Sequence, residues 1–230
     1  MKKFLRKIPF FLLFLKIAKD LTAKIPIGIF SMHENSLNKN KFKQILIWHK
    51  QEYISPPPYF IKQACIKRNA VEQSVFVETG TYYGDTTKFL SYFSNKVISL
   101  EPSIVLYKKA QDLLADYKNI ELINGASEDV FPTLIPTLKG NVSFWLDGHF
   151  SAGVTFKGKR ETPIVLELAE IKKCLKNFNR VSIMIDDFRC FDPKNVRYRD
   201  YPNRKFLVEW ADENQLNWNV EFDIFIAKNY

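Results

Sequence analysis

The sequence predicts an α/β fold built on a doubly wound, mostly parallel sheet and preceded by a basic helical extension. From Val75 onward, short apolar runs alternate with helical patterns, giving five strand–helix units in about 110 residues. The runs show no polar alternation, which is typical of strands buried on both faces by helices. We expect residues 1–54 to form the extension and residues 55–230 to form one domain.

The strands of the sheet are expected where apolar and β-branched residues cluster. These runs lie at 75–77, 96–100, 120–123, 142–146 and 181–185. A last strand or hairpin is expected over 218–227.

Helical patterns fill the intervals between the runs. The first helix is expected at 59–69, directly after Pro56-Pro57-Pro58, a stiff extended stretch that cannot be helical. Further helices are expected at 85–93, 104–117, 127–138, 163–177 and 206–215. Residues 31–45 are polar and rich in Asn and Lys, and they predict a loop or linker.

The basic character of the chain is concentrated near its start. The net charge is +9, yet residues 1–70 hold fourteen Lys and Arg against three Asp and Glu. That segment therefore carries +11 and the remainder carries −2. A nearly neutral domain argues against nucleic acid as a partner, whereas the extension favours contact with something anionic.

Residues 1–24 contain the apolar run 8–15, which Lys16 interrupts before it reaches the ~20 residues of a membrane-spanning helix. Three interpretations stay open: a helix packed on the domain or acting as a lid, an interfacial helix in peripheral contact with a membrane, and a cleaved signal. Three widely spaced cysteines predict free thiols and a cytoplasmic protein, at the inner membrane face if the interfacial helix is correct.

The turn after the first strand predicts a site for a cationic ligand. It contains Gly80 and Gly84, which permit a tight turn, with Glu78 two residues before the first glycine and Thr79 between them. A pyrophosphate site would have G-x-G-x-x-G, and an acid here would repel it. S-adenosylmethionine (SAM) has no phosphate but carries an ammonium and a sulfonium, so it fits this turn better.

Two later strand ends extend the predicted cofactor site. Glu101 ends the second strand, where a carboxylate can accept both ribose hydroxyls of SAM or of NAD. Ser127 opens the helix after the third strand, and we expect it to cap that helix, to contact the adenine, or both.

The fourth and fifth strands predict an acidic cluster. Asp147 follows one strand, and Asp186 and Asp187 follow the other, so the three carboxylates should converge and repel unless a cation lies among them. Oxygen ligands favour Mg²⁺. The alternative is separate duties, with Asp147 on the SAM ammonium or the substrate. His149 is then a candidate general base.

Three segments resemble a family of bacterial class I SAM-dependent methyltransferases, which have a Rossmann-like fold. They are Glu78-Thr79-Gly80-Thr81-Tyr82-Tyr83-Gly84-Asp85, Phe144-Trp145-Leu146-Asp147-Gly148-His149-Phe150-Ser151 and Ile185-Asp186-Asp187-Phe188-Arg189. More distantly, the strand-end acids are similar to those of macrocin-type, metal-dependent sugar O-methyltransferases. The C-terminal part is short for the usual final antiparallel strand pair of this fold.

The resemblance implies O-methylation of a sugar hydroxyl in cell-surface glycan biosynthesis, with Asp147, Asp186 and Asp187 on Mg²⁺. Glu78, Thr79, Gly80, Gly84, Glu101, Ser127 and Asp147 would then contact SAM, and His149 and Asp147 would be catalytic. Residues 150–160 would cover the acceptor, with Lys157, Lys159 or Arg160 on its anionic part. A nucleotide- or lipid-linked sugar would suit those bases and the basic extension.

Two rival functions stay open. A nicotinamide-dependent oxidoreductase could use a similar sheet, although G-x-G-x-x-G is absent. A non-catalytic scaffold could keep a degenerate methyltransferase fold at a membrane. An RNA methyltransferase is disfavoured by the nearly neutral domain.

Overall fold

The computed structural model describes residues 32–148, 162–194, 196–198 and 200–230. The chain divides into two compact units, residues 1–47 and residues 48–230. Helix α2 (Met32–Lys50) runs from the first unit into the start of the second. The expected loop over residues 31–45 is therefore wrong: the segment is polar, but it contains no Gly or Pro to interrupt a helix. No helix among the described residues is long and apolar enough to cross a membrane.

The domain of residues 48–230 is built on a seven-stranded sheet with the order β3-β2-β1-β4-β5-β7-β6. Strands β1 to β5 pair in parallel, whereas β7 pairs antiparallel with both β5 and β6. The doubly wound, mostly parallel sheet is thus confirmed. The strands are β1 (Val75–Thr79), β2 (Lys96–Glu101), β3 (Ile120–Asn124), β4 (Gly140–Leu146), β5 (Phe178–Ile185), β6 (Asn217–Glu221) and β7 (Ile224–Lys228).

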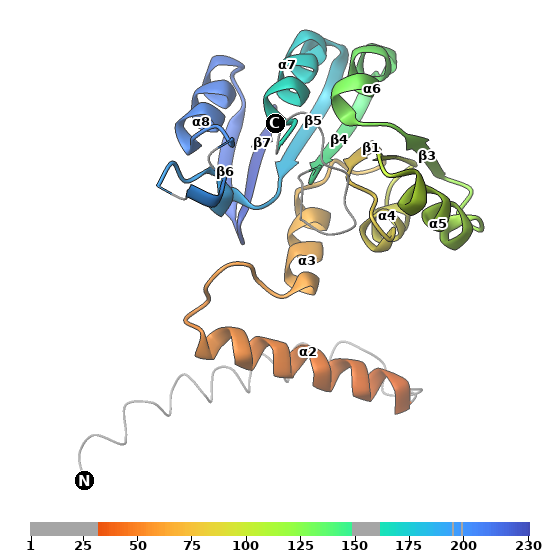
Figure 1. Ribbon diagram of the computed structural model, residues 1–230, viewed down its shortest axis with the longest axis vertical. Helices are drawn as coiled ribbons and strands as arrows, with labels where there is room; N and C mark the ends of the chain where they lie inside the picture. The colour runs from red at the N-terminus through yellow and green to blue at the C-terminus, as the bar shows by residue number, and fades with distance from the viewer. Residues whose placement is uncertain (1–31, 149–161, 195, 199) are drawn as a thin grey trace. The chain divides into compact units, whose positions relative to one another are not determined.

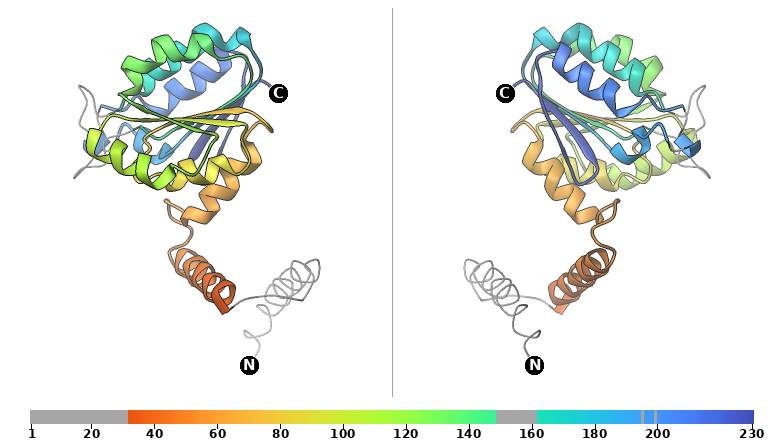
Figure 2. Two further views of the ribbon diagram at one scale, coloured as in Figure 1. Left: turned by 90° about the vertical axis from the view of Figure 1, so that its right-hand side faces the viewer. Right: turned by 90° about the vertical axis from the view of Figure 1, so that its left-hand side faces the viewer.

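Helices cover both faces of the sheet and make a three-layer domain (Figures 1 and 2). One face carries α3 (Tyr59–Asn69), α4 (Asp85–Ser91) and α5 (Ile104–Leu114). The other face carries α6 (Ser127–Leu134), α7 (Ile164–Cys174) and α8 (Arg204–Glu213). Short 3-10 turns extend α6 and α7, at Ile135–Thr137 and Leu175–Asn177, and two more lie between β5 and α8, at Phe188–Phe191 and Val196–Tyr198.

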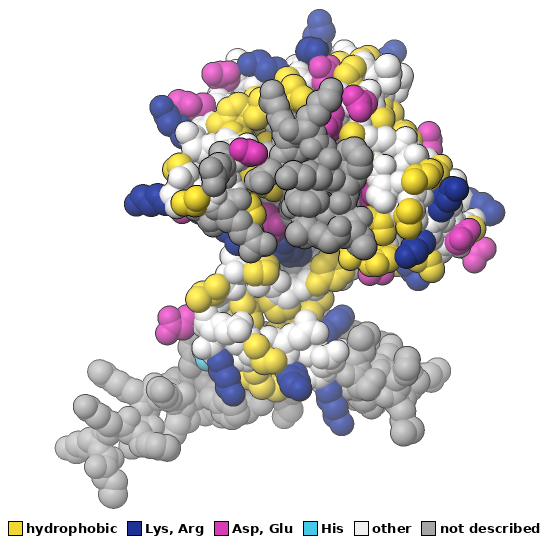
Figure 3. All heavy atoms as spheres, viewed as in Figure 1, with side chains coloured by type: hydrophobic (Ala, Val, Ile, Leu, Met, Phe, Trp, Pro, Cys, Tyr) yellow, Lys and Arg dark blue, Asp and Glu magenta, His cyan; other side chains and the backbone are white. Residues whose placement is uncertain are grey.

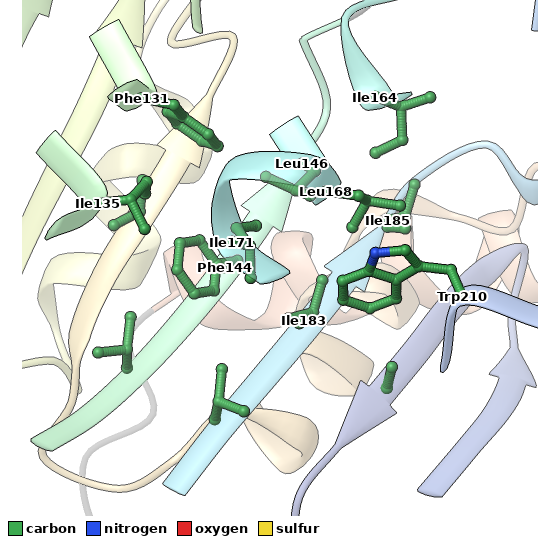
Figure 4. Close-up of a cluster of buried hydrophobic side chains, with 14 of the residues drawn as sticks. Phe131, Ile135, Phe144, Leu146, Ile164, Leu168, Ile171, Ile183, Ile185 and Trp210 are labelled. Carbon is green, nitrogen blue, oxygen red and sulfur yellow. The ribbon is translucent and has the colours of Figure 1, made fainter. Parts of the chain in front are cut away.

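Alternate residues of the central strands enter two separate cores. On β4, Phe144 joins the core beneath α6, α7 and α8, while its neighbour Trp145 joins the core beneath α3 and α4. On β5, Ile183 and Met184 divide in the same way. Figure 4 shows the first core, where Trp210 of α8 lies near the isoleucines of β5. Because both faces of these central strands are buried, the sequence shows mostly apolar runs there.

The C-terminal strands complete the sheet as a tight hairpin. Val220 of β6 pairs with Phe225 of β7, and Ile185 of β5 pairs with that same Phe225. Residues 217–228 are therefore long enough for the final antiparallel pair whose presence the sequence left open. Two left-handed residues, Phe222 and Asp223, make the turn.

The parallel register brings four strand ends to one edge of the sheet. Thr79 pairs with Leu100 and with Leu146, and Leu146 pairs with Ile185. The residues that follow these positions, among them Glu101, Gly80, Asp147 and Asp186, therefore emerge side by side. This edge is where ligands bind in open α/β sheets.

Candidate functional site

The turn between β1 and α4 depends on two glycines. Gly80 and Gly84 have φ values of 87° and 84°, in the left-handed region that favours glycine. A Cβ at Gly80 would lie 2.8 Å from the backbone oxygen of Asp147, which is closer than real contacts allow. The amides of Gly80 and Thr81 donate to the Leu100 carbonyl at 3.0 and 3.1 Å. The turn therefore lies between the end of β2, to which it is hydrogen-bonded, and the residue that follows β4.

Glu101 ties the end of β2 to the same turn. Its Oε2 accepts a hydrogen bond from the Tyr82 amide at 2.8 Å, and its Oε1 accepts one from the Ser103 amide at 2.9 Å. The residue is 4% exposed, and burial raises the pKa of its carboxyl while the two amides lower it. The carboxylate is therefore fixed beside the glycine turn, as a ribose-binding group would be.

Glu78 lies beneath the turn, on the α4 face of the sheet. Its Oε2 accepts hydrogen bonds from the hydroxyls of Thr87 at 2.5 Å and Ser99 at 2.6 Å. The side chain is fully buried, and its Oε1 has no hydrogen-bond partner within the described chain. Burial raises the pKa of Glu78 to about 8. Glu78, which we predicted to contact the cofactor, therefore lies beneath the turn, where its hydrogen bonds link β1 to α4 and β2.

Ser127 does not cap α6 as expected. The N-cap is Ala126, no side chain caps the helix, and Ser127 is the first helical residue. Its side chain is buried next to Glu167, whose pKa the Ser127 hydroxyl lowers. The sequence suggested a cap because Ser precedes a helical pattern, but the helix begins one residue earlier than a capping Ser127 would require.

A cation does lie among the acids at the ends of β4 and β5, but a lysine supplies it. Lys62 of α3 donates from Nζ to both oxygens of Asp186, at 2.6 and 2.7 Å, and reaches Asp187 Oδ1 at 3.4 Å. Its side chain is 11% exposed. Burial raises the pKa of Asp186 to about 7 with help from nearby Asp147, although Lys62 opposes the shift. Sequence reasoning missed Lys62 because it lies 124 residues from its partner.

Arg189 holds the outer side of the same cluster. Its Nη1 donates to Asp187 Oδ1 at 2.7 Å and also pairs with Asp223 in the β6–β7 turn. The Arg189 backbone amide donates to Asp223 Oδ1 at 2.8 Å. Asp187 is therefore occupied by side chains from its own loop and from α3.

These pairings do not fit the expected Mg²⁺ site at Asp147, Asp186 and Asp187. A divalent ion needs the carboxylate oxygens that Lys62 and Arg189 already engage. Within the described chain, no group of three or more His, Cys, Asp or Glu residues has the arrangement of a metal site. We therefore assign no step to a metal ion.

A pocket opens between the ends of β4 and β5 and the start of α7. Its polar lining comes from three carboxyl groups, Asp147, Glu167 and Asp186, and from the hydroxyls of Thr162 and Tyr201. Its apolar lining includes Leu146, Ile164, Ile185 and Phe191. The pocket adjoins the glycine turn, since Gly148 donates its amide to Thr79 Oγ1 at 3.1 Å and also lines the pocket.

Glu167 is the second residue that sequence reasoning missed. It lies in the first turn of α7, in a stretch whose sequence predicts only a helix. Its position follows from the packing of α7 on the sheet, which the sequence pattern does not specify. His149 and the predicted acceptor cover, including Lys157, Lys159 and Arg160, lie outside the described residues, so their roles stay predictions.

Comparison with known proteins gives distant structural likenesses only. No family model matches the chain, and no curated protein matches it. An rRNA methylase of Streptococcus thermophilus is 17% identical over 76% of this chain and 96% of its own, with a TM-score of 0.44. A SAM-dependent methyltransferase of Aquifex aeolicus is 14% identical over 73% and 87%, with a TM-score of 0.46. SMU.1697c of Streptococcus mutans, solved with SAH, is 16% identical over 76% and 98%, with a TM-score of 0.46. At these TM-scores we infer nothing about activity from the likenesses.

Proposed function

We propose that the chain is a SAM-dependent methyltransferase that methylates a hydroxyl group of a sugar. One observation carries this proposal: the glycine turn after β1 is bonded to Glu101 at the end of β2 and backed by the buried Glu78. This arrangement places the carboxylate of Glu101, rather than phosphate-binding amides alone, beside the glycine turn at the sheet edge. It suits a nucleoside with ribose hydroxyls and a positive charge.

The strand order supports this choice over a nicotinamide-dependent oxidoreductase. A dinucleotide-binding sheet has the order 3-2-1-4-5-6, whereas here the antiparallel β7 lies between β5 and β6. An RNA acceptor has less support, because acidic and basic side chains are interspersed on the face of the domain drawn in Figure 3.

A methyl group on a sulfonium is intrinsically reactive, so the protein would act mainly by positioning SAM and the acceptor. Glu101 would accept hydrogen bonds from the ribose hydroxyls, and Gly80 would keep the turn close to the backbone of Asp147 at the edge of the site. Asp147, at the junction of the turn and the pocket, would orient the ammonium of SAM or the acceptor. The +11 charge of residues 1–70 would favour an acceptor carrying phosphate outside this pocket, such as a nucleotide- or lipid-linked sugar.

Calorimetric titration of the full chain with SAM and with NAD⁺ tests the proposal. We expect SAM to bind and NAD⁺ not to bind. Glu101→Gln should weaken SAM binding by ~10-fold, because an amide cannot accept from both Tyr82 and Ser103. Glu121→Gln is the matched control, since Glu121 forms an exposed ion pair with Lys96 on the neighbouring strands. Binding of NAD⁺ alone would establish the oxidoreductase instead, and binding of neither would favour the scaffold.

A further inference from the structure

Lys62 occupies a position of α3 that is buried against the sheet. It shares the buried side of the helix with Cys65, Ile66 and Asn69, at the i, i+3, i+4, i+7 spacing of one helix face. A charged side chain at such a position is costly to bury unless it is paired. Because apolar side chains often replace a buried ion pair without loss of stability, packing of α3 does not by itself account for a lysine here.

The ammonium group of Lys62 lies where carboxyl groups from two strand ends converge. Its Nζ is 2.6 and 2.7 Å from the two oxygens of Asp186 and 3.4 Å from Asp187 Oδ1. Burial lowers the pKa of this ammonium, but the charges of Asp186, Asp187 and Asp147 raise it above its ordinary value. All three carboxyl groups that the sequence predicted as Mg²⁺ ligands therefore act on a single nitrogen atom, which stays charged.

A divalent ion would have to displace these contacts to reach the acids. Mg²⁺ lies about 2.0–2.1 Å from its oxygen ligands. Both oxygens of Asp186 are bonded by Lys62 Nζ, and Oδ1 also accepts the Asp187 amide at 2.7 Å. Asp187 Oδ1 accepts from Arg189 Nη1 at 2.7 Å. An ion that bound these oxygens would lie beside the Lys62 ammonium, which would repel it.

We propose that Lys62 is a built-in cation that takes the place of a divalent metal ion at the ends of β4 and β5. Its ammonium holds the Asp186 carboxyl group in one orientation and excludes divalent ions from the three acids. Lys62 is thus a positioning residue that acts through Asp186. The exclusion of metal does not depend on the proposed function, whereas its consequence, methyl transfer without a divalent ion, rests on that function.

Titration of the full chain with Mn²⁺ tests the proposal, with electron paramagnetic resonance to detect the free ion. We expect the wild type to bind Mn²⁺ no more tightly than ~1 mM. Lys62→Met removes the ammonium and leaves the three acids, so it should bind Mn²⁺ at least ~10-fold more tightly than the wild type. Lys62→Arg keeps the positive charge and should behave like the wild type. Lys172→Met, which removes an exposed lysine, is the matched control and should change nothing.

Thermal unfolding with and without Mn²⁺ provides a second measurement. The ion should raise the melting temperature of Lys62→Met and leave that of the wild type unchanged, because only the variant has a site for it. Adding Asp186→Asn to Lys62→Met should abolish both gains, which separates a site at these acids from weak binding elsewhere.

Two outcomes overturn the inference. One is a wild type that binds Mn²⁺ in the micromolar range and loses it with Asp186→Asn. The other is a folded Lys62→Met variant whose affinity for Mn²⁺ does not rise. If Lys62→Met does not fold, the wild-type titration decides alone. A wild type that excludes Mn²⁺ but does not bind SAM would defeat the proposed function and leave the metal exclusion standing.

Discussion

The two halves of the sheet edge are held together by different interactions. At β1 and β2, backbone amides and hydroxyls hold the carboxyl groups of Glu101 and Glu78. At β4 and β5, charged side chains from distant segments hold Asp186 and Asp187, and a pocket opens beside them. The first half, which we call the cradle, is held by hydrogen bonds between β1, α4 and β2, whose partners lie at most 21 residues apart. The second is held by ion pairs, one of which joins Lys62 and Asp186 across 124 residues of the chain.

Replacing Lys62 should have the largest effect on this comparison. Lys62→Met leaves Asp186 buried without its counter-ion, so the free energy of unfolding should fall by ~3–5 kcal/mol. Urea denaturation measures the change. Lys172→Met, which breaks an exposed pair with Glu213, should cost less than ~1 kcal/mol. Equal effects of the two substitutions would show that the buried ion pair is no more important than a surface one.

A double substitution refines that result. Lys62→Met combined with Asp186→Leu removes both charges of the pair, and it should recover most of the lost stability. No recovery would mean that Lys62 stabilises the domain through packing of α3 and not through its charge.

The buried carboxyl group of Glu78, in the half of the edge at β1 and β2, should make the stability of the domain depend on pH. In the unfolded chain Glu78 ionises near its ordinary pKa of 4.5, but in the folded protein burial raises that pKa to about 8. Between these values the folded state keeps a proton that the unfolded state has lost, so the free energy of unfolding falls as pH rises. Glu167 and Asp186, with pKa values raised to about 7, act in the same direction.

Glu78→Gln isolates the contribution of one carboxyl group. The variant should lose less stability than the wild type between about pH 5 and about pH 8, by on the order of 3 kcal/mol. Chemical denaturation at several pH values measures the slope, with Glu121→Gln as an exposed control. A pH dependence identical to that of the wild type would contradict the raised pKa.

The glycine turn offers a matched pair of substitutions. Gly80 and Gly140 both have positive φ, but only at Gly80 would a Cβ collide, with the backbone of Asp147. Ala at Gly140 should cost ~1–2 kcal/mol from backbone strain, and Ala at Gly80 should cost ~2 kcal/mol more and weaken SAM binding by ~10-fold or more. Denaturation and calorimetry measure the two quantities. Normal SAM affinity in Gly80→Ala would remove the turn from the cofactor site.

The smallest predicted change in stability comes from the hydrogen bond that joins the end of β1 to the loop after β4. Thr79 Oγ1 accepts the Gly148 amide, so Thr79→Val should leave that amide without this partner and cost ~1 kcal/mol. Thr133→Val removes an exposed hydroxyl contact on α6 and should be nearly neutral. If the Thr79 variant is as stable as the Thr133 variant, the two halves are not joined through this bond.

The sequence by itself determined the fold class and the order of the elements. The run 181–185, apolar except for Ser182, reflects a strand buried on both faces, and that requirement can be recognised from the local sequence. The same reasoning placed Glu101, Asp147 and Asp186 on one edge, since parallel strands end together. The loop predicted for residues 31–45 is wrong, because polar side chains without Gly or Pro are compatible with a helix.

Only the tertiary structure decided which groups neutralise the acids and which carboxyl groups line the pocket. Lys62 reaches Asp186 across 124 residues, and Glu167 enters the pocket wall through the packing of α7. Neither residue belongs to a motif, because a charge pair or a pocket wall is defined by distance in space and not by spacing along the chain. For the same reason, the sequence suggested a metal ion at a place where the folded chain puts an ammonium group.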